Sequence, residues 1–292
     1  MKPQYLTLLG VGLIGGSIGL AVKRWLGQWV VTGYGNDAQS LSDALKLGAV
    51  DRIVADPAQA VRGADLVVLC TPIQAFPDLL PRIASSLSTE CNVTDVASTK
   101  LSAVRWAEQH LGTHSRFVGS HPMAGSERQG VAAARADLFD GAACLMTPTP
   151  HTNPAALRDV ADFWKRLRMR CVMLEPLAHD RLMAQISHLP HAMAAALVNL
   201  ADPTALDLAG RGFADTTRIA AGDADLWTGI LLDNRESVLS ALERMRDELG
   251  ELHRILLDHD AGALHRWLQR ASRRRAAMAP SAMGGAPRPE ST

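Results

Sequence analysis

Two kinds of apolar segment alternate along the N-terminal part of the chain. Short apolar runs have the length and composition of buried strands, at 5–9, 29–34, 65–70 and 92–96. Apolar residues recur at helical spacing in the segments between and after them, 17–26, 41–47, 58–62, 76–87 and 100–111. Strands that alternate with helices predict an α/β fold, a mostly parallel, doubly wound sheet with helices on both faces.

The pattern changes near residue 175. Strands are predicted at 117–119, 143–146 and 171–174, with a helix at 154–167, but only helical spacing follows Pro176. One late helix carries an apolar stripe at spacings of four and three, Val238, Leu242, Met245, Leu249, Leu252 and Leu256. The stripe predicts either a helical dimer interface or an ordinary core face, and periodicity does not separate the two.

A glycine-rich turn joins the first strand to the first helix. Its sequence is Gly10-Val11-Gly12-Leu13-Ile14-Gly15, and a second strand follows within about thirty residues. This spacing is typical of a Rossmann-type dinucleotide-binding unit, whose pyrophosphate lies on the helix N-terminus. We therefore expect a dinucleotide-binding domain over 1–177, an all-helical substrate and dimerisation domain over 178–279, and a disordered tail over 280–292.

Several polar residues follow predicted strands directly. Thr71 and Pro72 end one strand, Ser98 follows another, and His121 stands before Pro122 at the end of a third. Ligands of such sheets bind beyond the carboxyl ends of the strands, so these residues should gather beside the glycine turn. Histidine exchanges protons near neutral pH, so His121 is a candidate acid–base group, although a structural loop histidine is the alternative.

Composition excludes several function classes. Lys+Arg and Asp+Glu both number 30, and this balance gives no electrostatic reason to expect nucleic acid or a membrane surface as partner. The four cysteines are widely spaced, unlike a zinc site or a dense disulfide framework, and they suit a reducing cytoplasm. The apolar segment 6–22 is too short and too rich in glycine to span a membrane.

The C-terminal half adds two polar groups. His188 and His191 lie three apart on one predicted helical face, without the carboxylate or cysteine that a metal site would need. Arg218 lies in an apolar setting, and its simplest role is an ion pair with Asp215.

Taken in order, several segments resemble the prephenate/arogenate (cyclohexadienyl) dehydrogenase family of tyrosine biosynthesis. They are GVGLIGGS at 10–17, TP at 71–72, TDVASTK at 94–100, GSHPMAGSE at 119–127, LFDGAACLMTP at 138–148, HDR at 179–181, SHLPH at 187–191, TRIA at 217–220 and DADLW at 223–227. The likeness spans about 6–240, and HPMAGSE with SHLPH is far more specific than the glycine motif. Ala97 stands where the family usually has Gly, and DADLW replaces the commoner DPxMW.

The resemblance implies a homodimeric oxidoreductase that uses NAD(P) to decarboxylate prephenate or arogenate oxidatively, giving 4-hydroxyphenylpyruvate or tyrosine. A hydride leaves the hydroxyl-bearing ring carbon, CO2 is lost and the ring becomes aromatic. By this likeness a neutral His121 takes the hydroxyl proton and Ser98 orients the reactants. Arg218 would bind a substrate carboxylate. The other residues implied to shape the pocket are Ser126, Glu127, His188, His191 and Asp215.

The sequence favours NAD over NADP. An acid at the tip of the second strand would bind the ribose hydroxyls, and this tip is Gly35-Asn36-Asp37. Asp37 is displaced by two positions, yet it would repel a 2′-phosphate, and no arginine is adjacent.

Two other function classes compete with this interpretation. A β-hydroxyacid dehydrogenase would have the same two-domain plan but needs a lysine in its helical domain, and no lysine follows Lys165. A nucleotide-sensing protein without catalysis would have no need of Ser98, His121 and Arg218 together. The choice between prephenate and arogenate, and any feedback inhibition by tyrosine, stay open at this stage.

Overall fold

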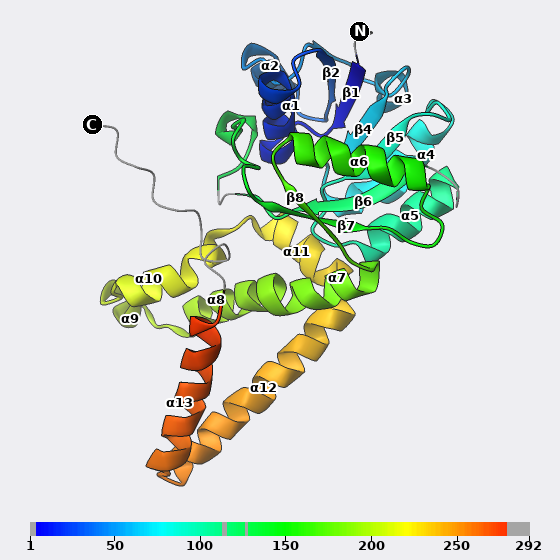
Figure 1. Cartoon of the computed structure of the whole chain (residues 1–292). Coiled ribbons are helices and arrows are strands. Elements are labelled where there is room, and N and C mark those ends of the chain that lie inside the picture. The colour runs from blue at the N-terminus through cyan, green and yellow to red at the C-terminus, as the bar shows by residue number, and fades with distance from the viewer. Residues whose placement is uncertain (1–3, 113–115, 126–127, 279–292) are drawn as a thin grey trace, which may run out of the picture. The chain divides into compact units, whose positions relative to one another are not determined.

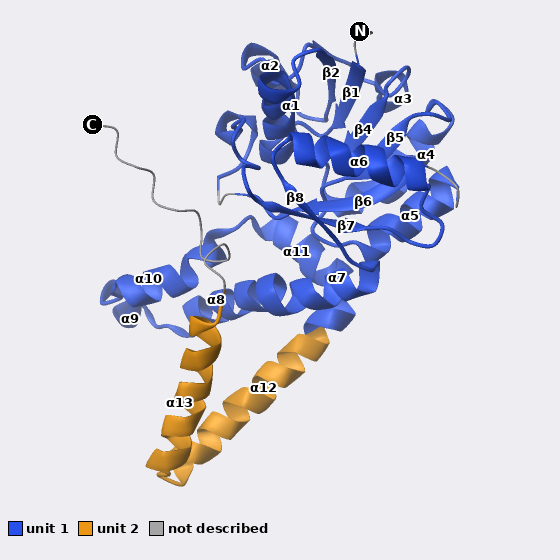
Figure 2. Cartoon of the chain, viewed as in Figure 1, with its two compact units in different colours: residues 1–238 blue, residues 239–292 orange. Residues whose placement is uncertain are grey.

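The structure, a computed structural model, describes residues 4–112, 116–125 and 128–278 (Figure 1). Ser126, Glu127 and the tail expected over 280–292 lie outside these described residues. The chain forms two compact units, residues 1–238 and residues 239–292 (Figure 2).

The first unit is built on an eight-stranded sheet in the order β3-β2-β1-β4-β5-β6-β7-β8. Its strands are β1 (Gln4–Leu9), β2 (Trp29–Tyr34), β3 (Arg52–Ile53), β4 (Leu66–Leu69), β5 (Asn92–Asp95), β6 (Phe117–Pro122), β7 (Ala143–Thr147) and β8 (Arg170–Met173). All neighbouring strands are parallel except β6 and β7. The order reverses between β1 and β4, which is the switch point where doubly wound sheets bind their ligands.

Helices cover both faces of this sheet, because strand residues alternate between two cores. In β1, for example, Leu6 and Leu8 face one core and Leu9 faces the other. The first core contains α1 (Leu13–Trp25), α2 (Ala38–Lys46) and α6 (Pro154–Arg166). The second contains α3 (Pro57–Ala60), α4 (Phe76–Ala84) and α5 (Leu101–Leu111). The predicted α/β fold is therefore confirmed.

The strand that carries His121 differs from the prediction. β6 does not stop at Gly119 but continues through Pro122, since it turns from its parallel partner β5 to pair antiparallel with β7. His121 is paired opposite Leu145 within that ladder. The residues before and after His121 in β6 also pair with β7, so the histidine lies within a β-ladder and not in a loop.

Between β8 and residue 278, where the described part of the chain ends, the structure contains only helices. They are α7 (Pro176–Met183), the π-helical segment η3 (Ala184–His188), α8 (Leu189–Leu200), α9 (Pro203–Asp207), α10 (Arg211–Thr217), the short 3-10 turn η4 (Arg218–Ala221), α11 (Ala224–Asp233), α12 (Arg235–Leu257) and α13 (Ala261–Ala276). α7, η3 and α8 follow one another without a break and form one long helical run (Figure 1). Two further 3-10 turns lie among the strands, η1 (Ile73–Ala75) and η2 (Val131–Ala133).

The second unit contains most of α12 and all of α13. Arg270 on α13 donates to Glu248 and Glu251 on α12, at 2.9 and 3.2 Å. Leu249 and Leu256 of the α12 stripe are 49% and 54% exposed, so within this chain the stripe is not a fully covered core face. Among the described residues, no helix is both long and apolar enough to cross a membrane.

Candidate active site

The glycine turn after β1 has the geometry of a phosphate-binding site. Gly10 has φ +104°, and a Cβ there would lie 2.7 Å from the carbonyl carbon of Cys70. A Cβ at Gly15 would lie 2.1 Å from the carbonyl oxygen of Gly10. A Cβ at Gly12 would instead meet nothing within 4 Å. The first and third glycines are therefore needed for packing, and the second leaves open space at the start of α1 for a pyrophosphate.

Two cavities meet at this turn. One has a volume of about 510 Å³ and is lined by the glycine turn, by Asn36 and Asp37 at the β2 end, and by residues of α4 that include Asp78 and Arg82. The other has a volume of about 490 Å³ and contains Leu13, Ile14, Ser98 and His121 in its wall. Both cavities share Gly12, Cys70, Thr71 and Pro72. The residues expected at the carboxyl ends of the strands are thus brought together in one cleft formed by these two cavities.

Asp37 lies at the end of this cleft that is remote from His121. Its carboxylate caps α2, accepting hydrogen bonds from the amides of Gln39 and Ser40 at 3.1 and 3.2 Å and from the Ser40 hydroxyl at 2.5 Å. The Ser40 hydroxyl and these amides lower the pKa of Asp37. A negative charge therefore stands in the wall of the cavity where an adenosine ribose would lie.

His121 projects from the opposite face of β6 to Ser120. Ser120 points into the core, where its hydroxyl receives hydrogen bonds from Thr94 Oγ1 at 2.8 Å and from Trp164 Nε1 at 3.1 Å. Residues of a strand alternate in direction, so His121 points to the other side, into the wall of the cavity that Ser98 also lines. The buried Ser120 network fixes the strand beneath the histidine.

A second histidine contacts His121 directly. His121 Nδ1 lies 2.9 Å from Nε2 of His179 on α7, and the two rings meet edge to face. His179 Nδ1 lies 2.8 Å from Oδ1 of Asp180, and this carboxylate receives the amides of Lys100 and Leu101 at 2.8 and 2.9 Å. Sequence reasoning assigned no role to His179 or Asp180. The signal that could have found them is HDR at 179–181, one of the segments that resemble the family, which lies in the middle of α7.

An ion pair lies under the same residues. Asp95 and Lys100 bond through their side chains, and both side chains are completely buried. Oδ1 of Asp95 accepts the Ser120 amide at 2.9 Å. Oδ2, the oxygen that bonds Lys100, also accepts the Ala97 amide at 3.0 Å. The pair therefore ties the end of β5 to β6 and fixes the loop that carries Ser98. These two residues were seen in the segment TDVASTK but were not predicted as site residues.

The surroundings hold His121 in its neutral form. Burial lowers its pKa well below the ordinary value, and nearby His179, Lys100 and His188 act in the same direction. Burial also lowers the pKa of His179, although the hydrogen bond to Asp180 opposes the shift. An imidazole that is neutral at physiological pH is the form that can accept a proton.

His188 of η3 and His191 of α8 are buried further along the same helical run. Asn234 Nδ2 lies 2.7 Å from the carbonyl oxygen of Asp180 and 3.1 Å from His188 Nδ1. Asn234 therefore donates to His188 Nδ1, and the proton of the neutral ring is on Nε2, which has no hydrogen-bond partner among the described residues. His191 stacks on Trp227 with a centroid distance of 3.5 Å.

The structure does not bring every predicted residue into the cleft. His188 and His191 are buried nearby but do not line the two cavities, and Arg218 and Asp215 are exposed on η4 and α10. η4 packs on α8, the helix of His191. Ser126 and Glu127 lie outside the described residues.

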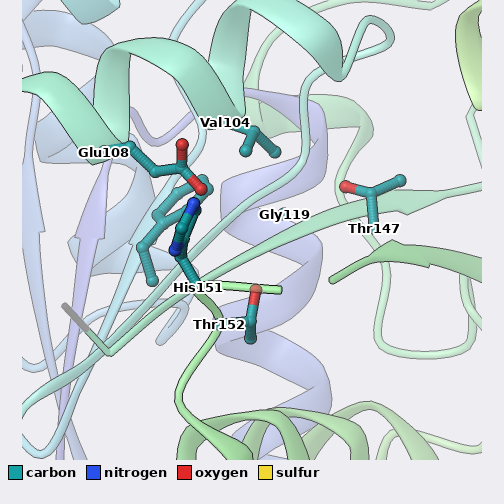
Figure 3. Close-up of a pocket in the computed structure, with 7 residues that line it drawn as sticks. Val104, Glu108, Gly119, Thr147, His151 and Thr152 are labelled. Atoms are coloured by element: carbon teal, nitrogen blue, oxygen red, sulfur yellow. The ribbon is translucent and has the colours of Figure 1, made fainter. Parts of the chain in front are cut away.

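A third, very small cavity lies beneath β6, in the layer between α5 and β7 (Figure 3). Its volume is about 10 Å³, which holds about one water molecule. Figure 3 shows Glu108 and His151 facing one another in its wall, and Glu108 also accepts the Thr149 hydroxyl at 2.8 Å. This void is too small for an organic ligand. The cleft at the strand ends is the candidate active site, because there Ser98 and His121 lie beside the glycine turn.

Two family models match the chain. Residues 18–173 match the nucleotide-binding domain of prephenate dehydrogenase, and residues 175–270 match its dimerization domain. The two matches together cover β2 to β8, Ser98 and His121 of the candidate active site, and the helices as far as the middle of α13. Strand β1 and the glycine turn precede the first match.

Known proteins are similar over nearly the whole chain. The prephenate dehydrogenase of Bacillus subtilis is 35% identical over 91% of this chain and 74% of its own length. A crystal structure of prephenate dehydrogenase from A. aeolicus in complex with hydroxyphenyl propionate and NAD+ has a TM-score of 0.88 and 31% identity, covering 94% of this chain and 98% of that one. A crystal structure of Synechocystis arogenate dehydrogenase has a TM-score of 0.81 and 31% identity, covering 94% of this chain and 99% of that one.

Proposed function

The chain belongs to the prephenate dehydrogenase family of oxidoreductases, and from this premise we propose that it catalyses the NAD-dependent oxidative decarboxylation of prephenate, arogenate or both. The observation that carries the proposal is that His121 and Ser98 stand in the wall of the same cavity. The histidine is half-buried and its surroundings hold it neutral, and both residues stand beside the glycine turn of the nucleotide-binding domain. The product, 4-hydroxyphenylpyruvate or tyrosine, places the enzyme in tyrosine biosynthesis.

His121 is proposed as the base of this reaction. When bound, NAD+ supplies the hydride acceptor. As the C–H electron pair leaves the ring carbon, the hydroxyl oxygen becomes a carbonyl, and its proton passes to an imidazole nitrogen of His121. The bond to the ring carboxylate then breaks, CO2 leaves, and its electron pair makes the ring aromatic. The ring oxygen recovers the proton from His121, so that no net proton is released or consumed.

Ser98 is proposed to orient the reacting hydroxyl. It lines the same cavity as His121 and follows β5, whose end is fixed by Asp95. The loop is therefore anchored on both sides of Ser98, by Asp95 and by Lys100. An anchored hydroxyl can position a reactant with little entropy loss.

Arg218 is proposed to bind a substrate carboxylate through its guanidinium. The support is its position at the start of η4, which packs on the helix of His191. His188 is buried beside the cleft and is proposed to help shape the pocket. Its Nε2 has no hydrogen-bond partner among the described residues, and a buried donor needs an acceptor. His191, Asp215, Ser126 and Glu127 are proposed to complete the pocket.

NAD is the proposed cofactor, since the A. aeolicus relative binds NAD+ and Asp37 stands in the cavity wall. Titration of the protein with NAD+ and NADP+ tests this proposal, with tighter NAD+ binding expected. Asp37→Asn is a matched variant, because Asn also caps helices but carries no charge to repel a 2′-phosphate. The Asp37→Asn variant should bind NAD+ and NADP+ with more similar affinities than the unaltered protein does. Tighter binding of NADP+ than of NAD+ by the unaltered protein would contradict the proposal.

The decisive assay supplies prephenate and L-arogenate, each with NAD+, and measures the reduced nicotinamide. We expect turnover of at least one substrate. His121→Asn should abolish turnover with little change in substrate affinity, whereas Arg218→Gln should mainly raise KM. His253→Asn, at an exposed position on α12, is the matched control and should leave turnover unchanged. Absence of turnover with both substrates would refute the proposed function.

We further propose a homodimer in the cytoplasm. The matched dimerization domain supports the dimer, together with the exposed leucines of α12. Four free cysteines, all at least half-buried, suit a reducing compartment. The domain boundaries predicted from the sequence, with a division at 177–178, are retained as part of this proposal.

A further inference from the structure

The contacts behind His121 determine which of its nitrogens can act as the base. The chain of contacts runs from the start of α5 through Asp180 and His179 to His121. Hydrogen positions are not free along such a chain, because each acceptor requires a donor. The chain can therefore be followed from its fixed end to the histidine.

The fixed end is the carboxylate of Asp180. Its two oxygens accept the amides of Lys100 and Leu101, at the N-terminus of the eleven-residue helix α5. A helix N-terminus favours a negative charge, and backbone amides can only donate. Asp180 is therefore an ionised acceptor, and the group facing it must supply a proton.

That group is Nδ1 of His179, 2.8 Å from Asp180 Oδ1. A neutral imidazole has one N–H, so a proton on Nδ1 leaves Nε2 with a lone pair. Nε2 of His179 lies 2.9 Å from Nδ1 of His121, which must then donate. With its proton on Nδ1, neutral His121 has its lone pair on Nε2.

We propose that His179 and Asp180 are positioning residues that hold His121 in the tautomer with the proton on Nδ1 and the lone pair on Nε2. This proposal rests on the proposed role of His121 as the base. The Nδ1 atom is occupied by His179, so Nε2 is the nitrogen left to receive the substrate proton. After the transfer, the imidazolium still donates from Nδ1 to His179, and no second proton has to move.

Without Asp180 the arrangement would be ambiguous. A neutral His179 could then carry its proton on Nε2 and donate to His121 Nδ1, which would place the His121 proton on the atom that has to act as base. The charged and titratable groups that act on the His121–His179 pair come from four elements: Asp95 on β5, Lys100 before α5, Asp180 on α7 beside His179 itself, and His188 on η3. Of these and His179, only His179 is hydrogen-bonded to the His121 ring.

The direct test is the tautomer itself. The unaltered protein, labelled with nitrogen-15 in histidine, should show by long-range nitrogen–proton correlation a His121 ring protonated on Nδ1 and bare on Nε2. His121→Asn identifies the signal. A ring protonated on Nε2 would overturn the proposal. This measurement needs no substrate, so it decides the proposal even if neither prephenate nor arogenate is turned over.

The kinetic test uses Asp180→Asn, whose amide can donate to His179 Nδ1 and so reverse the chain. We expect kcat to fall about 100-fold or more, with KM and the NAD+ affinity changed by less than about threefold, because only proton transfer is impaired. The His121 signal should shift toward protonation on Nε2. Asp202→Asn is the matched control, since Asp202 also accepts a backbone amide at a helix start and lines neither cavity of the cleft.

Two variants of His179 separate positioning from packing. The amide oxygen of Gln can accept from His121 Nδ1, whereas Leu cannot, so His179→Gln should retain a kcat about tenfold or more above that of His179→Leu. Thermal melting establishes that both variants fold. An unchanged kcat in Asp180→Asn, or equal kcat values in the two His179 variants, would overturn the proposal.

Discussion

Lys100 and Asp95 form a completely buried ion pair below the residues of the cleft. Two buried charges are tolerated only as a pair, so removing one partner leaves an uncompensated charge that costs about 3–5 kcal/mol. Lys100→Met should therefore lower the free energy of unfolding by about that amount, as measured by chemical denaturation. Asp95→Asn with Lys100→Met should recover part of the loss, since neither charge is then left alone.

The control for this prediction is the exposed pair Lys46–Asp43. Exposed pairs contribute less than about 1 kcal/mol, so Lys46→Met should hardly change the free energy of unfolding. Equal effects of the two lysine substitutions would mean that burial of the Lys100 pair has no energetic consequence.

His188 makes stability depend on pH. Burial lowers its pKa from 6.5 to about 4, so the unfolded chain binds a proton before the folded chain does. This contribution to stability is fully present above about pH 6.5 and is lost as the pH falls toward 4. The loss amounts to about 3 kcal/mol for a shift of this size.

The measurement is the free energy of unfolding at about pH 7.5 and about pH 4.5. His188→Gln should show a smaller decrease than the unaltered protein, because the group that titrates is gone. His253→Gln, exposed on α12, should show the same decrease as the unaltered protein. If His188→Gln loses as much stability on acidification as the unaltered protein does, burial of His188 does not cause the loss of stability at low pH.

Residue types at strand ends could be predicted from the sequence, but their partners could not. Ser98, His121 and the glycines follow directly from motif and position, since strand order alone places them at one edge. The contacts of His121 with His179, and of Asp180 with Lys100, join residues 58 and 80 positions apart. Such pairings depend on how α7 docks beside the sheet, which local periodicity does not contain.

At the scale of elements, the π-helical segment η3 determines where its histidine points. Nine residues separate His179 from His188, which in a regular α-helix would place them about half a turn apart. The wider turn of η3 shifts the later residues back around the axis, and Asn234 then bonds both Asp180 and His188. Apolar periodicity predicted helix here but gave no sign of the extra residue.

Deletion of Gln185 tests this interpretation. Gln185 is exposed within η3, so its removal should restore a regular helix without opening the core. The site histidines would then lose their relative register, and kcat/KM should fall about 100-fold while circular dichroism stays nearly unchanged. Gln185→Ala keeps the chain length and should be close to fully active. Full activity of the deletion would show that the π turn is incidental to the site.

Across the whole molecule, alternation of strands and helices was enough to predict the doubly wound sheet and the change to helices after Pro176. The two-residue strand β3 was not predicted, because it is too short for a period to show. The antiparallel pairing of β6 with β7 was also not predicted, since strand direction depends on the connection and not on the apolar pattern.

The stripe on α12 makes a prediction about assembly. Leu249 and Leu256 are about half exposed in one chain, and a charge placed in a dimer interface would have to be buried without a partner. Leu249→Glu should therefore shift a dimer toward monomer at low micromolar concentration, as measured by sedimentation velocity. Arg254→Glu, about 140° around the helix axis from Leu249, should leave the mass unchanged. The alternative, a stripe that packs only within its own chain, predicts the opposite pattern: Leu249→Glu would lower the free energy of unfolding while the sedimenting mass stayed the same.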